Sequence, residues 1–239
     1  MKYNHKLQPI FDRVINMFTD IIFTDIIAER YIKELVASCE PFAGCVHEID
    51  MVYSTLKNCF VNGKKLFCAG NGGSASDCEH ICGELMKSFV LPRPLPEDLH
   101  SKLTSLCGSS SLADSLQMGL PCISLTSHPS LNTAFLNDVD GKMTFAQQLL
   151  VLGNEGDVLL GLSTSGNAEN VCCAFQVAKA KGIRTILFTG QKTPPGICEK
   201  YSDVIFHAPE KETYKIQEYH LAVYHRICLM LEEYFYGKR

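Results

Sequence analysis

The sequence lacks a surplus of positive charge and any long apolar run, and each absence excludes a class of partner. A net charge of −4 gives no electrostatic case for binding nucleic acid or an anionic membrane. The longest uncharged apolar runs fall well short of a membrane span. The apolar run at 18–27 is broken by Asp20 and Asp25, so it does not have the pattern of a signal peptide. We therefore expect neither nucleic acid nor a membrane as a partner.

The sequence also lacks a Cys-x-x-Cys pair, although it contains twelve cysteines. Scattered cysteines of this kind predict free, mostly buried thiols in a reducing compartment, so we expect a cytoplasmic protein. The pair Cys78 and Cys82, four residues apart, is interpreted as two packing thiols. Hydrophobic and charged contents of 46% and 20% are ordinary for a globular protein. A chain of 239 residues is long enough for one substantial core with helical decoration.

The first part of the chain is predicted to be helical. Apolar residues recur at helical spacing between Phe11 and Leu35, which predicts a helical extension over 1–40. Pro41 begins a second helix that runs to about Phe60, and Asn62-Gly63 ends it. From there to the C-terminus, 41–239 is expected to form one domain.

Strand and helix patterns then alternate. Short apolar runs typical of buried strands lie at 65–69, 122–126, 158–163, 185–189 and 204–207. Helical patterns lie at 74–89, 131–152, 167–181 and 214–234. This alternation predicts an α/β fold with a five-stranded, parallel, doubly wound (flavodoxin-like) sheet flanked by helices.

A proline-rich insertion, at about 90–120, interrupts this order. The run Leu-Pro-Arg-Pro-Leu-Pro at 91–96 is stiff and extended, because each proline restricts its own φ and the residue before it. About thirty residues therefore separate a helix from a strand where a few would suffice. The insertion is either a tolerated surface element or a functional lid.

Two predicted strands end in small polar residues that open a helix. Asn-Gly-Gly-Ser at 71–74 follows the first strand, and Ser-Thr-Ser-Gly-Asn at 163–167 follows the third. Such turns offer backbone N–H groups, hydroxyls and a helix N-terminus to an anion, although any turn from strand to helix favours these residues. Two of them predict one phosphate site at the carboxyl ends of the strands. The candidate residues are Asn71, Gly72, Gly73, Ser74, Ser163, Thr164 and Ser165.

Two helices carry candidate acid, base or metal groups. His80 and Glu84 are four residues apart and share a helix face, as half of a zinc site, as a base with its neighbour, or simply as a solvated pair. Gln217 and His225, on the last helix, are spaced so that the long Gln side chain could reach a common point. Both are equally compatible with a surface or core polar role.

Four segments share their motifs and their order with one known family. They are Gly-Asn-Gly-Gly-Ser-Ala-Ser-Asp at 70–77 with His80 and Glu84, Ile-Ser-Leu-Thr-Ser at 123–127, the run at 156–167, and Ile-Gln-Glu at 216–218 with His225. In combination, over about 40–235, they resemble the phosphoheptose isomerases of the sugar-isomerase (SIS) fold. The resemblance implies interconversion of sedoheptulose 7-phosphate and D-glycero-D-manno-heptose 7-phosphate in heptose biosynthesis. It also implies a homotetramer with active sites at subunit interfaces, often with a zinc ion.

The resemblance also implies a role for each matching residue. Glu84 would be the base that forms the enediol, and His225 would be its acid/base partner. The zinc ligands would be His80, Glu84, Gln217 and His225. The phosphate would be held by Ser74 together with Ser163, Thr164 and Ser165.

Three positions depart from the family pattern. Ala168 stands where the family has a serine, so one phosphate hydroxyl is absent. His128 and Tyr214 stand where the family has aspartates near the sugar. The sequence therefore predicts a divergent branch in which the residues that face the sugar have changed. The alternatives are an isomerase of another ketose phosphate, or a non-catalytic SIS module that binds a sugar phosphate and regulates or bridges partners.

Overall fold

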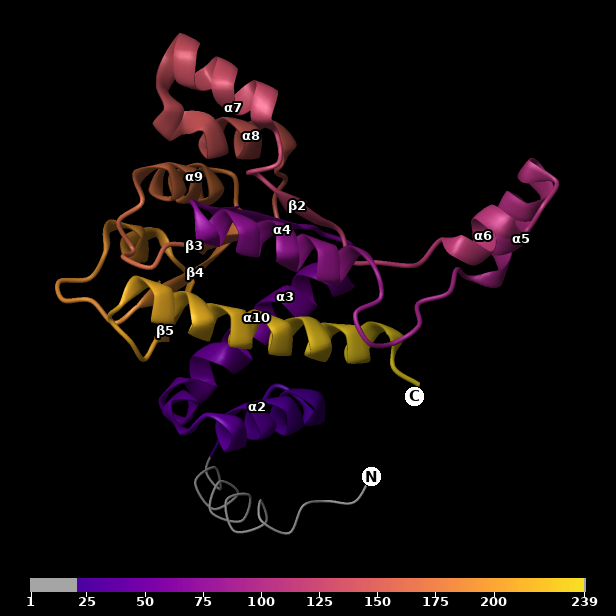
Figure 1. Ribbon diagram of the computed structural model, residues 1–239, viewed down its shortest axis with the longest axis horizontal. Helices are drawn as coiled ribbons and strands as arrows, with labels where there is room; N and C mark the ends of the chain where they lie inside the picture. The colour runs from indigo at the N-terminus through magenta and orange to yellow at the C-terminus, as the bar shows by residue number, and fades with distance from the viewer. Residues whose placement is uncertain (1–20, 239) are drawn as a thin grey trace.

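The fold is built on a wholly parallel five-stranded sheet, seen in a computed structural model that describes residues 21–238 (Figure 1). The strand order is β2-β1-β3-β4-β5. The strands are β1 (Leu66–Gly70), β2 (Cys122–Ser124), β3 (Val158–Leu162), β4 (Arg184–Gly190) and β5 (Val204–Ala208). The α/β class, the five strands and their parallel pairing confirm the predicted fold.

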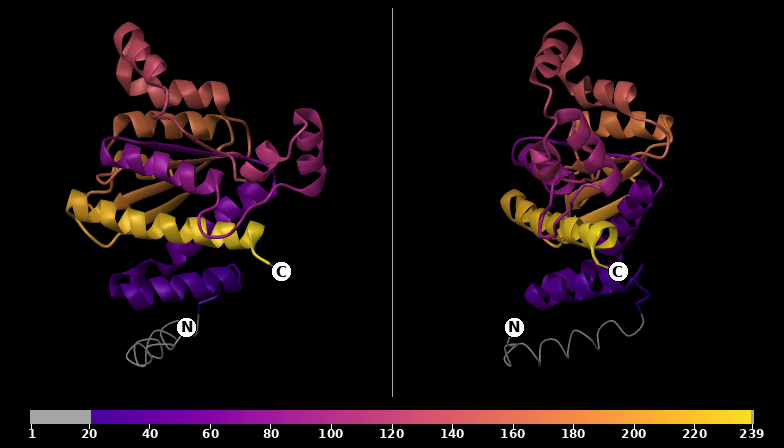
Figure 2. Two further views of the ribbon diagram at one scale, coloured as in Figure 1. Left: turned by 45° about the vertical axis from the view of Figure 1, so that its right-hand side comes forward. Right: turned by 90° about the vertical axis from the view of Figure 1, so that its right-hand side faces the viewer.

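Helices cover both faces of the sheet, as the apolar runs require. The helices of one layer are α3 (Val46–Val61), α4 (Gly73–Met86) and α10 (Thr213–Tyr236), and those of the other are α8 (Thr144–Leu152) and α9 (Glu169–Ala180). Successive residues of β1 alternate between the two cores: Leu66 and Cys68 pack on the α3–α4–α10 side, and Phe67 and Ala69 on the other. Figure 2 shows the sheet between these layers.

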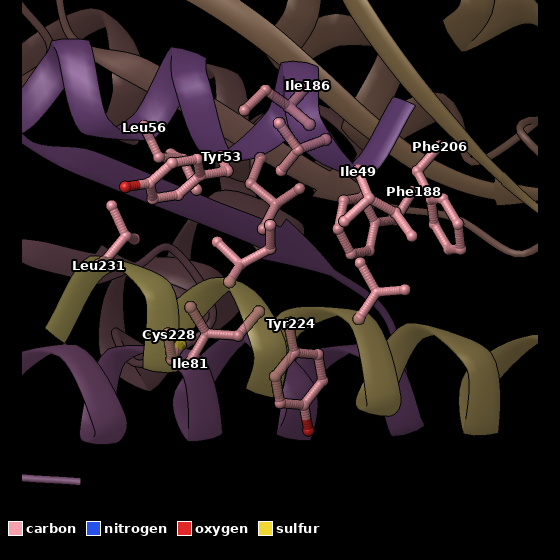
Figure 3. Close-up of a cluster of buried hydrophobic side chains, with 14 of the residues drawn as sticks. Ile49, Tyr53, Leu56, Ile81, Ile186, Phe188, Phe206, Tyr224, Cys228 and Leu231 are labelled. Atoms are coloured by element: carbon pink, nitrogen blue, oxygen red, sulfur yellow. The ribbon is translucent and has the colours of Figure 1, made fainter. Parts of the chain in front are cut away.

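The larger core lies between the sheet and the helices α3, α4 and α10. Phe188 and Phe206 from the sheet meet Tyr53 from α3 and Tyr224 from α10 in this core, and all four are at most 2% exposed. The hydroxyl of Tyr224 points away from the rest of this cluster (Figure 3). This buried aromatic residue therefore brings a polar group to the outer side of the core.

The helical extension is described only from residue 21 onward. The helix α2 (Ile26–Ser38) lies against α10, with Asp25 capping it through Ala28 N–H at 2.9 Å (Figure 1). The predicted helical spacing from Phe11 to residue 20 lies outside the described residues. Among the residues that the structure describes, no helix combines the length and apolar character needed to cross a bilayer.

Several predicted helices differ from the observed ones in extent. The pattern at 41–60 begins with a 3-10 turn, η1 (Glu40–Cys45), before α3. The single helix predicted at 131–152 is divided at Asp140. The backbone of this residue is extended, and its side chain accepts a hydrogen bond from Lys142 N–H, so a new turn begins at Gly141. The observed pieces are α7 (Pro129–Phe135), the π-turn η2 (Leu136–Asp140), the 3-10 turn η3 (Gly141–Met143) and α8.

The proline-rich insertion forms an arm that a buried arginine ties to the body. Its helices α5 (Glu97–Cys107) and α6 (Ser111–Ser115) project from the body, and α5 has no buried residue (Figures 1 and 2). This arginine is Arg93, whose side chain is fully buried and donates from Nε to Glu232 Oε1 at 2.9 Å. One further element, the 3-10 turn η4 (Ile197–Tyr201), joins β4 to β5.

Candidate functional site

The two Ser/Gly loops begin side by side at the centre of the sheet. β1 pairs with β3 in a register that places Gly70 opposite Leu162, so the loops at 71–74 and 163–167 leave the sheet together. The chain then turns towards β2 from β1 and towards β4 from β3, which makes this edge the topological switch point where α/β proteins bind ligands. The side-chain amides of Asn71, in the first loop, and Asn170, in the first turn of α9 after the second loop, are joined by hydrogen bonds of 2.9 and 2.8 Å.

The backbone of these loops presents unused N–H groups. Within the described part of the chain, the N–H groups of Gly72, Thr164 and Ser165 donate no hydrogen bond. The second loop turns at Gly166, where a φ of 66° favours glycine and an added Cβ would lie 3.1 Å from Gly196 Cα. Free N–H groups beside two helix N-termini are the arrangement expected of a phosphate site.

The loop hydroxyls differ in how far they are already engaged. Ser163 Oγ accepts the N–H of Ala168 at 3.3 Å, and Ser165 Oγ accepts the N–H of Asn167 at 3.2 Å. Both hydroxyls still have a proton to donate. Ser74 is 3% exposed and lies in the first turn of α4, whereas Thr164 is half-buried.

Gln217 lies against the first loop. A Cβ built on Gly73 would be 2.7 Å from Gln217 Nε2, so the absence of a side chain at Gly73 makes room for this amide. Gln217 is in the first turns of α10, and Gly73 is the first residue of α4. The amide is therefore placed beside the first residue of α4.

A second polar group lies farther along the same two helices. His80 Nε2 is 3.2 Å from Glu84 Oε1 on α4, and the His80 ring is 4.9 Å from the His225 ring on α10. The side chain of Glu84 is only 13% exposed, and Lys87 Nζ reaches Glu84 Oε2 at 3.5 Å. The i,i+4 pair predicted from sequence therefore faces the predicted histidine of the last helix.

Tyr224 and Asp77 orient the His80 ring. The Tyr224 hydroxyl donates to Asp77 Oδ1 at 3.1 Å and lies 2.9 Å from His80 Nδ1. Burial, and then the Asp77 charge, raise the pKa of Tyr224, so the phenol keeps its proton and donates it to Asp77. The hydroxyl then accepts from His80 Nδ1–H, which leaves the Nε2 lone pair directed at the Glu84 carboxylate. Two acceptors that face each other require a proton or a cation between them.

His225 is held as a neutral imidazole with a buried ring nitrogen that has no partner among the described residues. Burial, and then the neighbouring His80, lower the pKa of His225 below its ordinary value. Its Nε2 is buried and has no hydrogen-bond partner within the described residues. A buried unpaired acceptor of this kind is costly unless a ligand, proton or metal engages it.

Three of the four predicted zinc ligands, His80, Glu84 and His225, thus lie close together, and Gln217 lies elsewhere. Gln217 precedes His225 by eight residues, about 12 Å along a helix, and lies at Gly73 instead. His80, Glu84 and His225 do not bring three ligand atoms within 4.8 Å of one another in this chain. Among the described residues only the thiols of Cys68, Cys82 and Cys122 do so.

Sequence reasoning did not identify Tyr224, Asp77 or Arg93. Tyr224 precedes a predicted site residue, and Asp77 lies three residues before His80, so helical spacing could have indicated both. Arg93 lies in the proline-rich run at 91–96, which was interpreted only as a stiff, extended segment. Its guanidinium donates to the carbonyl oxygens of Leu85 at 2.7 Å and Glu84 at 3.1 Å, which fixes the end of the helix that carries Glu84.

Comparison with known proteins assigns the family. The phosphoheptose isomerase of Burkholderia pseudomallei (strain K96243) is 38% identical over 177 residues, which cover 74% of this chain and 77% of that protein. The phosphoheptose isomerase of Aneurinibacillus thermoaerophilus is 34% identical over 214 residues, 90% of this chain and 93% of its own. The chain belongs to the phosphoheptose isomerase family. The SIS domain family also matches it over residues 106–190.

Solved structures agree with this family at the level of the fold. A phosphoheptose isomerase from Francisella tularensis has a TM-score of 0.67 at 23% identity, covering 98% of this chain and 100% of its own. The corresponding enzyme of Neisseria gonorrhoeae has a TM-score of 0.62 at 24% identity, covering 96% and 98%. The predicted SIS fold is therefore confirmed, and the two relatives from Burkholderia and Aneurinibacillus confirm the family resemblance.

Proposed function

We propose that this member of the family is an aldose–ketose isomerase that interconverts sedoheptulose 7-phosphate and D-glycero-D-manno-heptose 7-phosphate, a step of heptose biosynthesis. The observation that carries the proposal is that α4 has the loop residues at its start and the His80–Glu84 pair farther along the same helix. Its first turn belongs to the anion-binding loops, and His80 follows Ser74 by six residues, about 9 Å along the axis. An extended sugar phosphate has its phosphate at one end and its reacting carbons at the other, as this spacing requires.

The side chains present match the chemistry of an enediol pathway. Glu84 takes the proton from the carbon acid, and neutral His225 exchanges a proton at the carbonyl oxygen or neighbouring hydroxyl. The Tyr224–Asp77 pair keeps the His80 ring in one orientation. Binding energy from the phosphate at the loops orients the reacting carbons. The free N–H groups of Gly72, Thr164 and Ser165 supply part of it.

A zinc ion suits the part of the site formed by His80, Glu84 and His225. Two imidazoles and a carboxylate are a donor set that zinc accepts, and the unpartnered His225 Nε2 and the opposed His80 and Glu84 acceptors favour a cation there. We propose His80, Glu84 and His225 as ligands, with Gln217 joining only from a second copy of the chain. When bound, zinc would supply Lewis-acid stabilisation of oxyanion charge.

We further propose a homotetramer in the cytoplasm. The half-exposed state of His80, at 41% of its side chain, and the separation of Gln217 from His225 favour a site completed by another subunit. All twelve cysteines are free, in agreement with a reducing compartment.

The decisive experiment is the Glu84→Gln substitution, assayed with sedoheptulose 7-phosphate. Loss of the general base should lower kcat by about 10²–10⁴-fold while sugar-phosphate binding survives. Glu155→Gln is a matched control, because Glu155 precedes β3 and so lies at the opposite edge of the sheet. Activity of Glu84→Gln within about threefold of wild type would remove Glu84 from the mechanism. A wild-type protein that binds the sugar phosphate without turnover would instead be a non-catalytic binding module.

A further inference from the structure

A cluster of three cysteine thiols lies on the opposite side of α4 from His80 and Glu84. Cys68 Sγ is 3.8 Å from Cys122 Sγ, and Cys82 Sγ is 3.0 Å from Cys122 Sγ. All three sulfur atoms lie within 4.8 Å of one another. They come from three elements: Cys68 from β1, Cys82 from α4 and Cys122 from β2. No other group of potential metal ligands within the described residues is as closely gathered.

We propose that Cys68, Cys82 and Cys122 form a second, thiolate zinc site that is independent of the isomerase centre. With Zn–S bonds of about 2.3 Å, the sulfur atoms of a tetrahedral site lie about 3.7–3.8 Å apart. The distance between Cys68 and Cys122 already has this value. The distance between Cys82 and Cys122 has to lengthen by less than about 1 Å, which a rotation of the Cys82 side chain on its helix can supply.

The surroundings of the cluster suit a bound ion. The three residues are 0%, 8% and 5% exposed and are held by paired strands and a packed helix, so the ligands are fixed before the metal arrives. Three thiolates select a thiophilic ion such as zinc over magnesium or calcium. Coordination releases the protons of the thiols that bind, so no oxidant or reductant is needed.

An open pocket gives the ion a path and a fourth ligand. Cys82 and Cys122 line a pocket of about 750 Å³, together with Glu79, Met86, Ser124 and His128. Three protein ligands with a water molecule in the fourth position is the composition of an open zinc site. Zinc bound there would fasten α4 to β1 and β2.

The test uses Co²⁺ as a spectroscopic probe, added to the metal-free full-length chain under reducing conditions. Thiolate-to-cobalt charge-transfer absorption should saturate at about one ion per chain. It should be lost in Cys68→Ala and Cys82→Ala. It should persist in Cys78→Ala, which removes a buried thiol one turn earlier on α4, and in His80→Ala, which damages only the isomerase centre. Absence of the absorption in wild type, or its loss in His80→Ala with retention in Cys82→Ala, would overturn the proposal.

A second measurement does not depend on whether the cysteine variants fold. X-ray absorption of zinc-loaded His80→Ala protein should show sulfur neighbours at about 2.3 Å, whereas only nitrogen or oxygen neighbours at about 2.0–2.1 Å would contradict the site. Zinc at about 100-fold excess over its Kd should raise the Tm of this protein by about 5–10 °C. A Cys82–Cys122 disulfide in protein purified without added oxidant would show that these thiols pair with each other instead.

Discussion

At the scale of single residues, two neighbouring glutamates of α10 show how burial changes the contribution of an ion pair to the free energy of unfolding. Glu232 is 1% exposed and binds Arg93 together with the N–H groups of Phe89, Val90 and Leu91. Burial alone would raise the pKa of Glu232, but these N–H donors, and then Arg93, lower it below its ordinary value. Glu233, the next residue, binds Arg30 at the surface.

We expect Arg93→Met to lower the free energy of unfolding by about 3–5 kcal/mol, because it leaves the Glu232 carboxylate buried without its cation. It also frees the carbonyl oxygens of Glu84 and Leu85 at the end of α4. Arg30→Met, the surface counterpart, should cost at most about 1 kcal/mol. Denaturant unfolding measures both. Equal losses in the two variants would mean that the buried pair adds nothing beyond a surface one.

A further residue, Tyr214, bears on which sugar is preferred. It is 58% exposed in the first turn of α10, at a position where the family resemblance predicts a carboxylate. Loss of a charge-assisted acceptor should weaken recognition of a sugar hydroxyl by about 1.5–3 kcal/mol, which is more than tenfold in affinity. We therefore expect Tyr214→Asp to raise kcat/KM for sedoheptulose 7-phosphate relative to C5 and C6 ketose phosphates. A sharp wild-type preference for sedoheptulose 7-phosphate that Tyr214→Asp weakens would refute this expectation.

At the scale of elements, the strands could be predicted better than the helices. A buried parallel strand is a continuous apolar run, and all five runs became strands, although β2 ends at Ser124 instead of residue 126. Helix ends depend on contacts from distant residues. The predicted helix at 74–89 stops at Met86, where Arg93 binds the carbonyl oxygens of its last turn. Helix α5 of the arm has no buried residue, so no contact with the core fixes its ends.

The start of α4 offers an element-scale prediction. Gly73→Ala would place a Cβ 2.7 Å from Gln217 Nε2, the mobile end of a side chain, so the fold should survive. Displacing this amide should raise the KM for the sugar phosphate by about tenfold, as for one lost hydrogen bond to a charged group. Gly83→Ala is the control on the same helix, because a Cβ there meets nothing within 4 Å. Steady-state kinetics with thermal melting would separate the two effects. An unchanged KM in Gly73→Ala would show that Gln217 does not assist binding.

At the scale of the whole molecule, the sequence could predict contacts only between residues on neighbouring strands or on one helix. The two loops meet because β1 and β3 are neighbours, and His80 meets Glu84 because they share a helix face. The contact between His80 and His225 depends on how α4 and α10 pack, and only the family resemblance indicated it. The position of Gln217 depends on the same packing. Within one chain the Gln217 side chain lies against Gly73 and not beside His225, so spacing along α10 was not enough to predict its position.

This separation predicts that inactive subunits can rescue one another. If Gln217 serves the His80–Glu84–His225 group of another subunit, then Glu84→Gln and Gln217→Ala should each be inactive alone. Mixed tetramers, made by coexpression with two affinity tags, should regain activity at about one quarter of their sites, as random mixing of two halves gives. Glu84→Gln mixed with His80→Ala is the control, because both lesions damage the same group and no subunit pairing repairs it. Recovery in the first mixture alone would establish a shared site, with light scattering verifying a tetramer. If the first mixture remained as inactive as the control, each chain would complete its own site, and Gln217 would have no role in the site of another subunit.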